Sequence, residues 1–270
     1  VRFLDNCLVL ITKLAILLLS YQITNIQKFN EAQKIVFFTI ITIVGLKLIK
    51  YGLGYNYFTY RDISLLIILS LSINLFKNNS LNLAASFFLG FIVPFSFFLV
   101  IDRGIYSLIA LSIIIFFIFI NKKHISLLMV FLGFIISILF VIYIFPKDEL
   151  LGFLENFYTI IKIKPFLDNY IYPTPFLSND TISTKGLISI SLSGILTLSI
   201  LMNKKNKIKN QFSFFLILCF LISIMVYKNA LGRSDAAHIR YSLGFNHMLI
   251  SICILHLLIS KIKLKKKFNK

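Results

Sequence analysis

The sequence is poor in charge, in cysteine and in tryptophan. Only 14% of its 270 residues are charged and 58% are hydrophobic, whereas an average soluble domain has about 25% charged residues. This balance excludes a water-soluble fold. The three cysteines show neither a disulfide framework nor a metal-binding spacing. Tryptophan is absent and arginine supplies only 5 of the 28 basic residues, a bias typical of AT-rich bacterial genomes.

Long apolar runs recur along the whole chain. Several approach or exceed the roughly 18–20 residues that cross a bilayer as a helix, and a signal peptide would account only for the first. They lack two-residue alternation, which excludes a closed barrel, so the spans must be helical. We therefore predict an all-α integral membrane protein, a bundle of about nine transmembrane helices. The predicted spans are residues 7–24, 33–53, 62–76, 81–101, 104–120, 125–146, 185–202, 211–227 and 243–260.

The distribution of lysine predicts the orientation of this bundle. If the C-terminus is cytoplasmic, the cytoplasmic segments contain 14 lysines and no arginine, as the positive-inside rule expects. All five arginines and nine of the ten acidic residues then lie outside. The net charge of +18 therefore reflects topology rather than binding to nucleic acid. We predict a multi-pass protein of the bacterial inner (plasma) membrane with a cytoplasmic C-terminus.

The longest segment between predicted spans is an outer loop at 147–184. It opens with apolar residues at helical spacing, which indicate an amphipathic helix lying in the membrane interface. These residues are Leu150, Phe153, Leu154, Phe157 and Ile161. We treat residues 1–270 as a single polytopic transmembrane domain. Because an odd number of spans would leave Val1 outside, we expect the complete protein to have one or more helices before it.

The short outer loop before the last span contains the densest group of ionisable residues. Arg233, Asp235, His238 and Arg240 fall within eight positions. If this stretch is helical, Asp235 and His238 share a face, and the carboxylate could orient or charge the imidazole. The two arginines would lie along one side, where their planar donors suit a phosphate. An outer loop of interfacial ion pairs is the structural alternative.

Two further acidic and basic pairs precede predicted spans. Asp102 and Arg103 lie in a short connection, which we interpret as a tight hairpin with Gly104 at the turn. A structural ion pair at the membrane boundary and a functional role are both open for this pair. Arg61 and Asp62 form the other pair, and we expect Asp62 to cap the helix that follows. The four histidines do not suggest a metal site.

The Arg233-x-Asp235-x-x-His238 pattern near the C-terminus resembles a segment of bacterial polytopic proteins similar to GT-C glycosyltransferases. Asp102-Arg103-Gly104 looks like another element of those proteins, so the resemblance covers about a dozen residues. It implies a membrane glycosyltransferase that uses a polyprenyl-phosphate-linked sugar on the non-cytoplasmic face, in cell-envelope glycan synthesis. Its partners would be membrane lipid, that donor and a glycan or lipid acceptor, with no nucleic acid.

The resemblance also implies roles for individual residues. Asp235, His238 and Asp102 would be catalytic, in acid–base or orienting roles, while Arg233, Arg240 and Arg103 would bind the substrate phosphate. The acidic residue that GT-C enzymes carry in their first outer loop would precede Val1. No cofactor is identified, and a divalent metal stays open.

Two other classes of membrane protein fit parts of the pattern. An O-antigen polymerase or ligase would also have outer arginines and histidines and one long outer loop, and would act on a lipid-linked pyrophosphate. A transporter or a non-catalytic membrane protein is the third reading. A transporter would place ionisable groups near the bilayer midplane, where this sequence has only Lys13.

Overall fold

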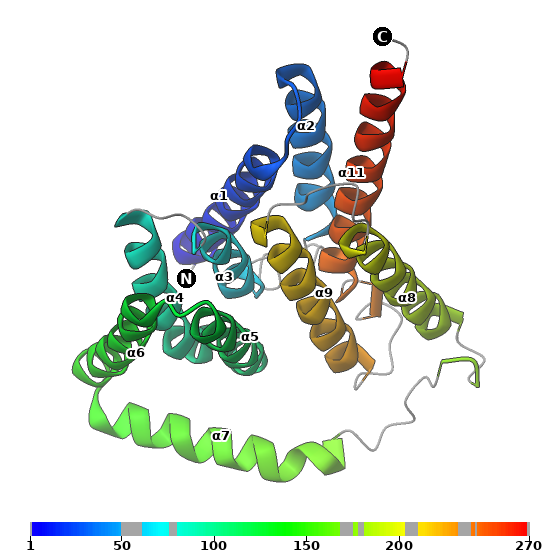
Figure 1. The fold of residues 1–270 in the computed structure, drawn as a ribbon. Coiled ribbons are helices and arrows are strands. Elements are labelled where there is room, and N and C mark those ends of the chain that lie inside the picture. The colour runs from blue at the N-terminus through cyan, green and yellow to red at the C-terminus, as the bar shows by residue number, and fades with distance from the viewer. Residues whose placement is uncertain are drawn as a thin grey trace. The chain divides into compact units, whose positions relative to one another are not determined.

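A computed structural model describes residues 2–49, 61–75, 80–167, 175–177, 181–202, 210–231, 239–240 and 242–268. Within these residues all regular secondary structure is helical (Figure 1). The helices are α1 (Arg2–Ile26), α2 (Glu31–Leu48), α3 (Ile63–Asn74), α4 (Ser80–Leu99), α5 (Ile101–Ile120), α6 (His124–Ile144), α7 (Lys147–Leu167), α8 (Thr181–Leu201), α9 (Asn210–Leu231) and α11 (Gly244–Phe268).

Seven of the described helices are long and apolar enough to cross a membrane, namely α1, α4, α5, α6, α8, α9 and α11. The other two predicted spans also contain helices, but α3 has only 12 residues and α2 carries three charged residues within its 18. A helix of 12 residues is about 18 Å long, well short of the roughly 30 Å of a bilayer core. The coarser prediction of an all-helical, multi-pass membrane protein is therefore supported, whereas the count of nine spans stays a prediction.

The exposed surface of α6 fits lipid rather than water. Large apolar side chains on this helix are 38% to 69% exposed, a pattern that soluble monomers rarely show. They are Ile125, Leu128, Phe131, Leu132, Ile135, Ile136, Ile138, Leu139, Phe140, Ile142 and Ile144. Its opposite face is lined with small residues and packs against α4.

The described helices group into two compact units. The first contains α1, α2, α8, α9 and α11, and the second contains α3 to α7. The expectations of one polytopic domain and of missing upstream helices stay predictions.

In the second unit, two glycines let the backbones of α4 and α6 touch. A Cβ atom added at Gly90 would overlap the carbonyl oxygen of Val130 on α6, and one added at Gly133 would overlap the carbonyl oxygen of Phe87 on α4. Close crossings over small residues are typical of membrane helices, because van der Waals contact replaces the hydrophobic effect there. The α4–α6 crossing therefore leaves no room for a side chain at Gly90 or Gly133.

Helix α3 lies inside the second unit, and nine of its 12 residues are buried. At its C-terminal end, Lys123 Nζ from the turn between α5 and α6 donates to the carbonyl oxygen of Leu75 at 2.7 Å. At its other end, Arg61 and Asp62 meet the beginning of α5. Helices α3 and α5 thus run in the same direction, as the predicted alternation of spans requires.

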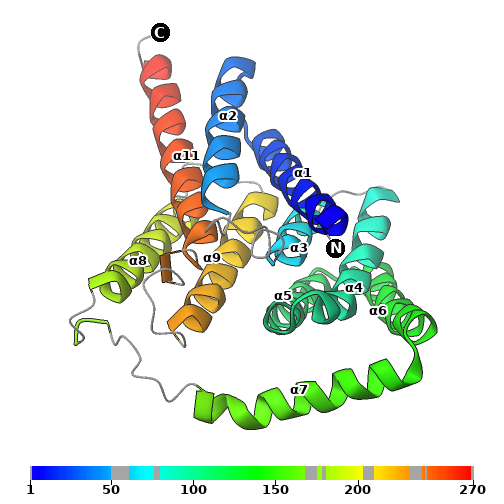
Figure 2. The same cartoon turned by 180° about the vertical axis from the view of Figure 1, so that it is seen from behind.

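Helix α7 follows α6 and turns away from it (Figures 1 and 2). Its aromatic rings pack against the last turns of α4, with Phe153 stacked on Phe98 at 4.7 Å between centroids and Phe157 edge-on to Phe97 at 6.3 Å. We predicted that Phe153 and Phe157 would recur at helical spacing in an amphipathic helix lying in the membrane interface. In the structure both rings contact α4. A second apolar stripe, Leu151, Leu154, Tyr158 and Ile161, is 49% to 68% exposed, and its place in the membrane interface stays a prediction.

In the first unit, side-chain contacts at both ends of the helices agree with the predicted alternation of span directions. His256 Nδ1 lies 2.9 Å from Gln27 Oε1 and its ring packs against Phe212, which joins the α1–α2 turn, the beginning of α9 and the second half of α11. At the opposite end, Tyr227 Oη donates to the carbonyl oxygen of Ser183 near the beginning of α8. Which end faces the cytoplasm stays a prediction.

Replacing Gly133 by alanine tests the α4–α6 crossing. The added methyl group would overlap the Phe87 carbonyl, so we expect a loss of about 1–3 kcal/mol of stability from overpacking. Gly152→Ala on α7 is the matched control, because nothing lies within 4 Å of the added Cβ and alanine favours helix by up to about 1 kcal/mol. Thermal unfolding of the two variants in detergent measures the difference. Equal stability of both variants would contradict the tight crossing.

Candidate functional site

The N-terminal ends of α3 and α5 bring four charged side chains into one cluster. Arg103 Nε donates to Asp62 Oδ1 at 2.6 Å, and Arg103 Nη1 donates to Asp102 Oδ2 at 2.9 Å. Arg61 Nη2 donates to the same Asp102 oxygen at 2.7 Å. We call these four residues the ion cluster. Its formal charges cancel, and it joins two positions that are 41 residues apart in the chain.

The first turn of α5 supplies half of the ion cluster. We predicted that Asp102, Arg103 and Gly104 would form a hairpin loop, but α4 ends at Leu99 and α5 already begins at Ile101. Asp102 Oδ1 accepts the backbone N–H of Arg103 at 2.9 Å, which satisfies one of the N–H groups left open at a helix beginning. The carboxylate is also favoured there by the helix dipole.

Gly104 is needed for packing rather than for a turn. It lies inside α5, and a Cβ atom at this position would approach Phe97 Cγ on α4 to 2.5 Å. Phe97 in turn contacts Phe157 of α7. The glycine therefore lets the beginning of α5, next to the ion cluster, pack closely against the end of α4.

Asp62 occupies the capping position of α3, but its side chain makes no capping hydrogen bond. The expectation of a simple cap was therefore wrong. The carboxylate instead accepts the Nε–H of Arg103, because a charge-assisted bond to a buried guanidinium is stronger than a bond to a neutral N–H. Leaving that guanidinium without a counter-charge would cost several kcal/mol.

The ion cluster has a closed side and an open side. The side chains of Arg103 and Asp62 are only 3% and 7% exposed, whereas those of Arg61 and Asp102 are 16% and 22% exposed. The Arg103 guanidinium also lies over the ring of Tyr106, 5.6 Å from its centroid. An incoming molecule would therefore meet Arg61 and Asp102 first, while Arg103 contacts the protein's own carboxylates.

The other predicted site residues are only partly described. Arg233, Asp235 and His238 lie outside the described residues. Arg240 is exposed and belongs to the first unit. Of the six predicted residues, the described part of the chain brings together Asp102 and Arg103, and it adds Arg61 and Asp62 to them.

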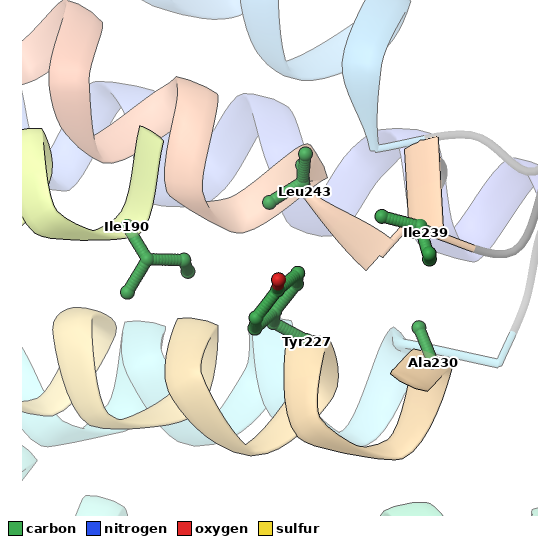
Figure 3. Close-up of a cluster of buried hydrophobic side chains, with 5 residues drawn as sticks. All are labelled: Ile190, Tyr227, Ala230, Ile239 and Leu243. Atoms are coloured by element: carbon green, nitrogen blue, oxygen red, sulfur yellow. The ribbon is translucent and has the colours of Figure 1, made fainter. Parts of the chain in front are cut away.

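Buried neighbours hold the exposed Arg240 in place. The adjacent Ile239 is fully buried, in a cluster of side chains from α8, α9 and the chain before α11 (Figure 3). The members of this cluster are Ile190, Tyr227, Ala230, Ile239 and Leu243. The chain that follows the predicted Arg-x-Asp-x-x-His segment is thus anchored at the end of α9.

Arg61 and Asp62 were recognised as a charged pair but not as part of a site. The signal that could have identified them is the mirrored order of the two dipeptides, Arg-Asp at 61–62 and Asp-Arg at 102–103, each at the beginning of an apolar helix. Opposite order allows each arginine to face the carboxylate of the other pair. Two unpaired charges in such places would be costly in a membrane, so complementary pairs are expected to meet.

The described residues contain no group of three or more histidine, cysteine or acidic side chains that could hold a metal ion. The chain also matches no protein-family model, no curated protein and no solved structure.

Asp62→Asn tests whether the closed side of the ion cluster holds α3 and α5 together. The variant removes the negative charge of Asp62 from beside the buried Arg103 guanidinium, while the charge of Asp102 remains. We therefore expect a loss of about 1.5–3 kcal/mol of stability. The control is Glu31→Gln, which breaks the surface pair between Glu31 and Lys34, where the glutamate is 84% exposed. Such pairs contribute about 0–1 kcal/mol. Thermal unfolding in detergent compares the two, and an Asp62→Asn variant as stable as the control would refute the role.

Proposed function

We propose that this protein is a membrane glycosyltransferase of the GT-C type. It would transfer a sugar from a polyprenyl-phosphate-linked donor to a glycan or lipid acceptor on the non-cytoplasmic face of the bacterial inner membrane, in cell-envelope glycan synthesis. The observation that carries the proposal is the ion cluster, where a partly exposed carboxylate and a partly exposed guanidinium meet at the beginnings of two apolar helices, α5 and α3. The choice of substrate comes from the resemblance of the motifs.

The burial of these charges favours a functional role for them over a purely structural one. Replacing a buried ion pair by packed apolar residues is often neutral or stabilising, so stability alone does not explain four charges in one place. Ionisable groups within membrane helices commonly mark a substrate site or an ion pathway. The open side formed by Arg61 and Asp102 is where such a substrate would bind.

Glycosyl transfer needs the two kinds of group that the ion cluster contains. The acceptor hydroxyl oxygen forms a bond to the anomeric carbon of the donor sugar as the bond from that carbon to the phosphate oxygen breaks. A carboxylate, Asp102 or Asp235, takes the hydroxyl proton. The electron pair leaves with the phosphate, whose charge is stabilised by arginines, with Arg233 and Arg240 as further candidates. His238 would act as a proton or hydrogen-bond partner in the same loop.

An O-antigen polymerase or ligase remains the alternative, and one feature favours it. Such proteins have one long outer loop, and the predicted loop at 147–184 contains the 21-residue α7. Both reactions transfer a glycan from a polyprenyl carrier that keeps its phosphate or pyrophosphate, so the linkage in the donor, monophosphate or pyrophosphate, separates them. Transport stays third, because Lys13 is exposed on α1 rather than buried in the first unit.

Sugar transfer in isolated membranes tests the proposed function. We expect turnover of a polyprenyl-monophosphate sugar by the wild type and a loss of at least about 100-fold in Asp102→Asn or Asp235→Asn, since general acid–base catalysis contributes about 100- to 10,000-fold. Arg233→Ala and His238→Ala should also lower the rate. Glu31→Gln, at an exposed pair on α2, is the control and should keep full activity. Turnover of a pyrophosphate-linked donor alone would support the ligase alternative.

Cysteine labelling tests the orientation on which the proposal depends. In a chain with Cys7 replaced by serine, the other two native thiols are buried, so single cysteines can be introduced at exposed positions. A membrane-impermeant maleimide should label Arg240→Cys from outside. It should label Lys261→Cys only after the cells are permeabilised. The reverse pattern would place the candidate residues in the cytoplasm and would exclude sugar chemistry facing the envelope.

A further inference from the structure

The ion cluster contains a carboxylate oxygen that two arginines share. Asp102 Oδ2 accepts a hydrogen bond from Arg61 at 2.7 Å and from Arg103 at 2.9 Å. Asp102 is also held by the backbone N–H of Arg103, through its other oxygen. The position of this carboxylate is therefore already determined by Arg103, and the bond from Arg61 is not needed to hold it.

The two arginines differ in how far an approaching molecule could reach them. Arg103 is closed in between two carboxylates and is 3% exposed, while Arg61 is 16% exposed and lies on the open side beside Asp102. Among the described bonds of the ion cluster, the Arg61–Asp102 bond is the one that can be exchanged for a bond to an outside anion without opening the closed side. A phosphate suits this exchange, because the guanidinium fork donates to two of its oxygens at once.

We propose that Arg61 is an exchangeable latch: it hydrogen-bonds to Asp102 in the empty site and moves to the phosphate group of an incoming ligand. Asp102 keeps its bonds with the side chain and the backbone N–H of Arg103. The exchange removes one hydrogen bond from Asp102 Oδ2 at the moment when the ligand is bound. Asp62 and Arg103 are positioning residues in this scheme. The proposal deepens the proposed function. The statement that the phosphate is lipid-linked rests on that proposed function.

This exchange predicts opposite effects of substitutions at two residues that contact each other. Arg61→Gln removes the cation that binds the phosphate, so affinity should fall by at least about tenfold, the equivalent of one charge-assisted hydrogen bond. Arg61→Lys keeps the charge but loses the fork, so its affinity should lie between those of the wild type and Arg61→Gln. Asp102→Asn removes the competitor for Arg61 together with a negative charge, so affinity should rise several-fold.

Binding of farnesyl phosphate to the purified full chain in detergent provides the measurement, with farnesol as the uncharged probe and inorganic phosphate as competitor. We expect the wild type to bind farnesyl phosphate and not farnesol. Competition by inorganic phosphate would show that the site recognises the phosphate alone, and lack of competition would show that the lipid chain is also required. Both results support the latch. Glu31→Gln should bind like the wild type, and the melting temperature of each variant checks that it is folded.

Weaker or unchanged binding by folded Asp102→Asn would overturn the latch, since a merely structural ion pair has no reason to oppose ligand binding. Absence of binding by the wild type would overturn it as well. Because binding is measured without sugar transfer, the two proposals can fail separately. Lower affinity in Arg61→Gln and higher affinity in Asp102→Asn, without any sugar transfer, would support the latch and refute the transferase. Sugar transfer by the wild type combined with weaker binding in Asp102→Asn would support the transferase and refute the latch.

Discussion

The buried guanidinium of Arg103 is the interaction on which the second unit depends. A charge that is 3% exposed must find counter-charges, and the chain supplies them from two places, Asp102 beside it and Asp62 at the beginning of α3. Meeting that requirement brings the N-terminal ends of α3 and α5 together. The same requirement leaves Arg61 and Asp102 at the open side, so the packing of the helices and the geometry of the candidate site have one cause.

The short α3 is the second consequence of this arrangement. With 12 residues it cannot span a bilayer alone, and its ends are held by polar contacts, the ion cluster at one and Lys123 at the other. At the C-terminal end, Lys123 bonds to a backbone carbonyl that would cost several kcal/mol if left unsatisfied in lipid. Burial of α3 inside the unit is therefore what makes a half-length helix acceptable.

Continuous apolar runs in the sequence predicted the helices. The predictions failed for residues whose role is set by tertiary contacts. All nine predicted spans contain a helix, and Phe153 and Phe157 lie in the helix α7. Their contacts with α4 were not foreseen, because helical spacing shows which residues share a face but not what covers it. Likewise Asp62 was expected to cap its own helix, since a local rule cannot see a buried arginine 41 residues away. Gly104 was assigned to a turn because a local sequence pattern cannot show that Phe97 packs against it.

The neutrality of the ion cluster explains why a phosphate site would include carboxylates at all. Two arginines alone at the beginnings of α3 and α5 would be strongly destabilising whenever no ligand was bound. Asp62 and Asp102 remove that cost in the empty state, but they also compete with any anion that arrives. Under the proposed exchange, a ligand must therefore hydrogen-bond to Arg61 better than a carboxylate does, which a phosphate can do and the hydroxyl or carbonyl groups of neutral lipids cannot. The carboxylates would thus stabilise the empty fold and make the site selective.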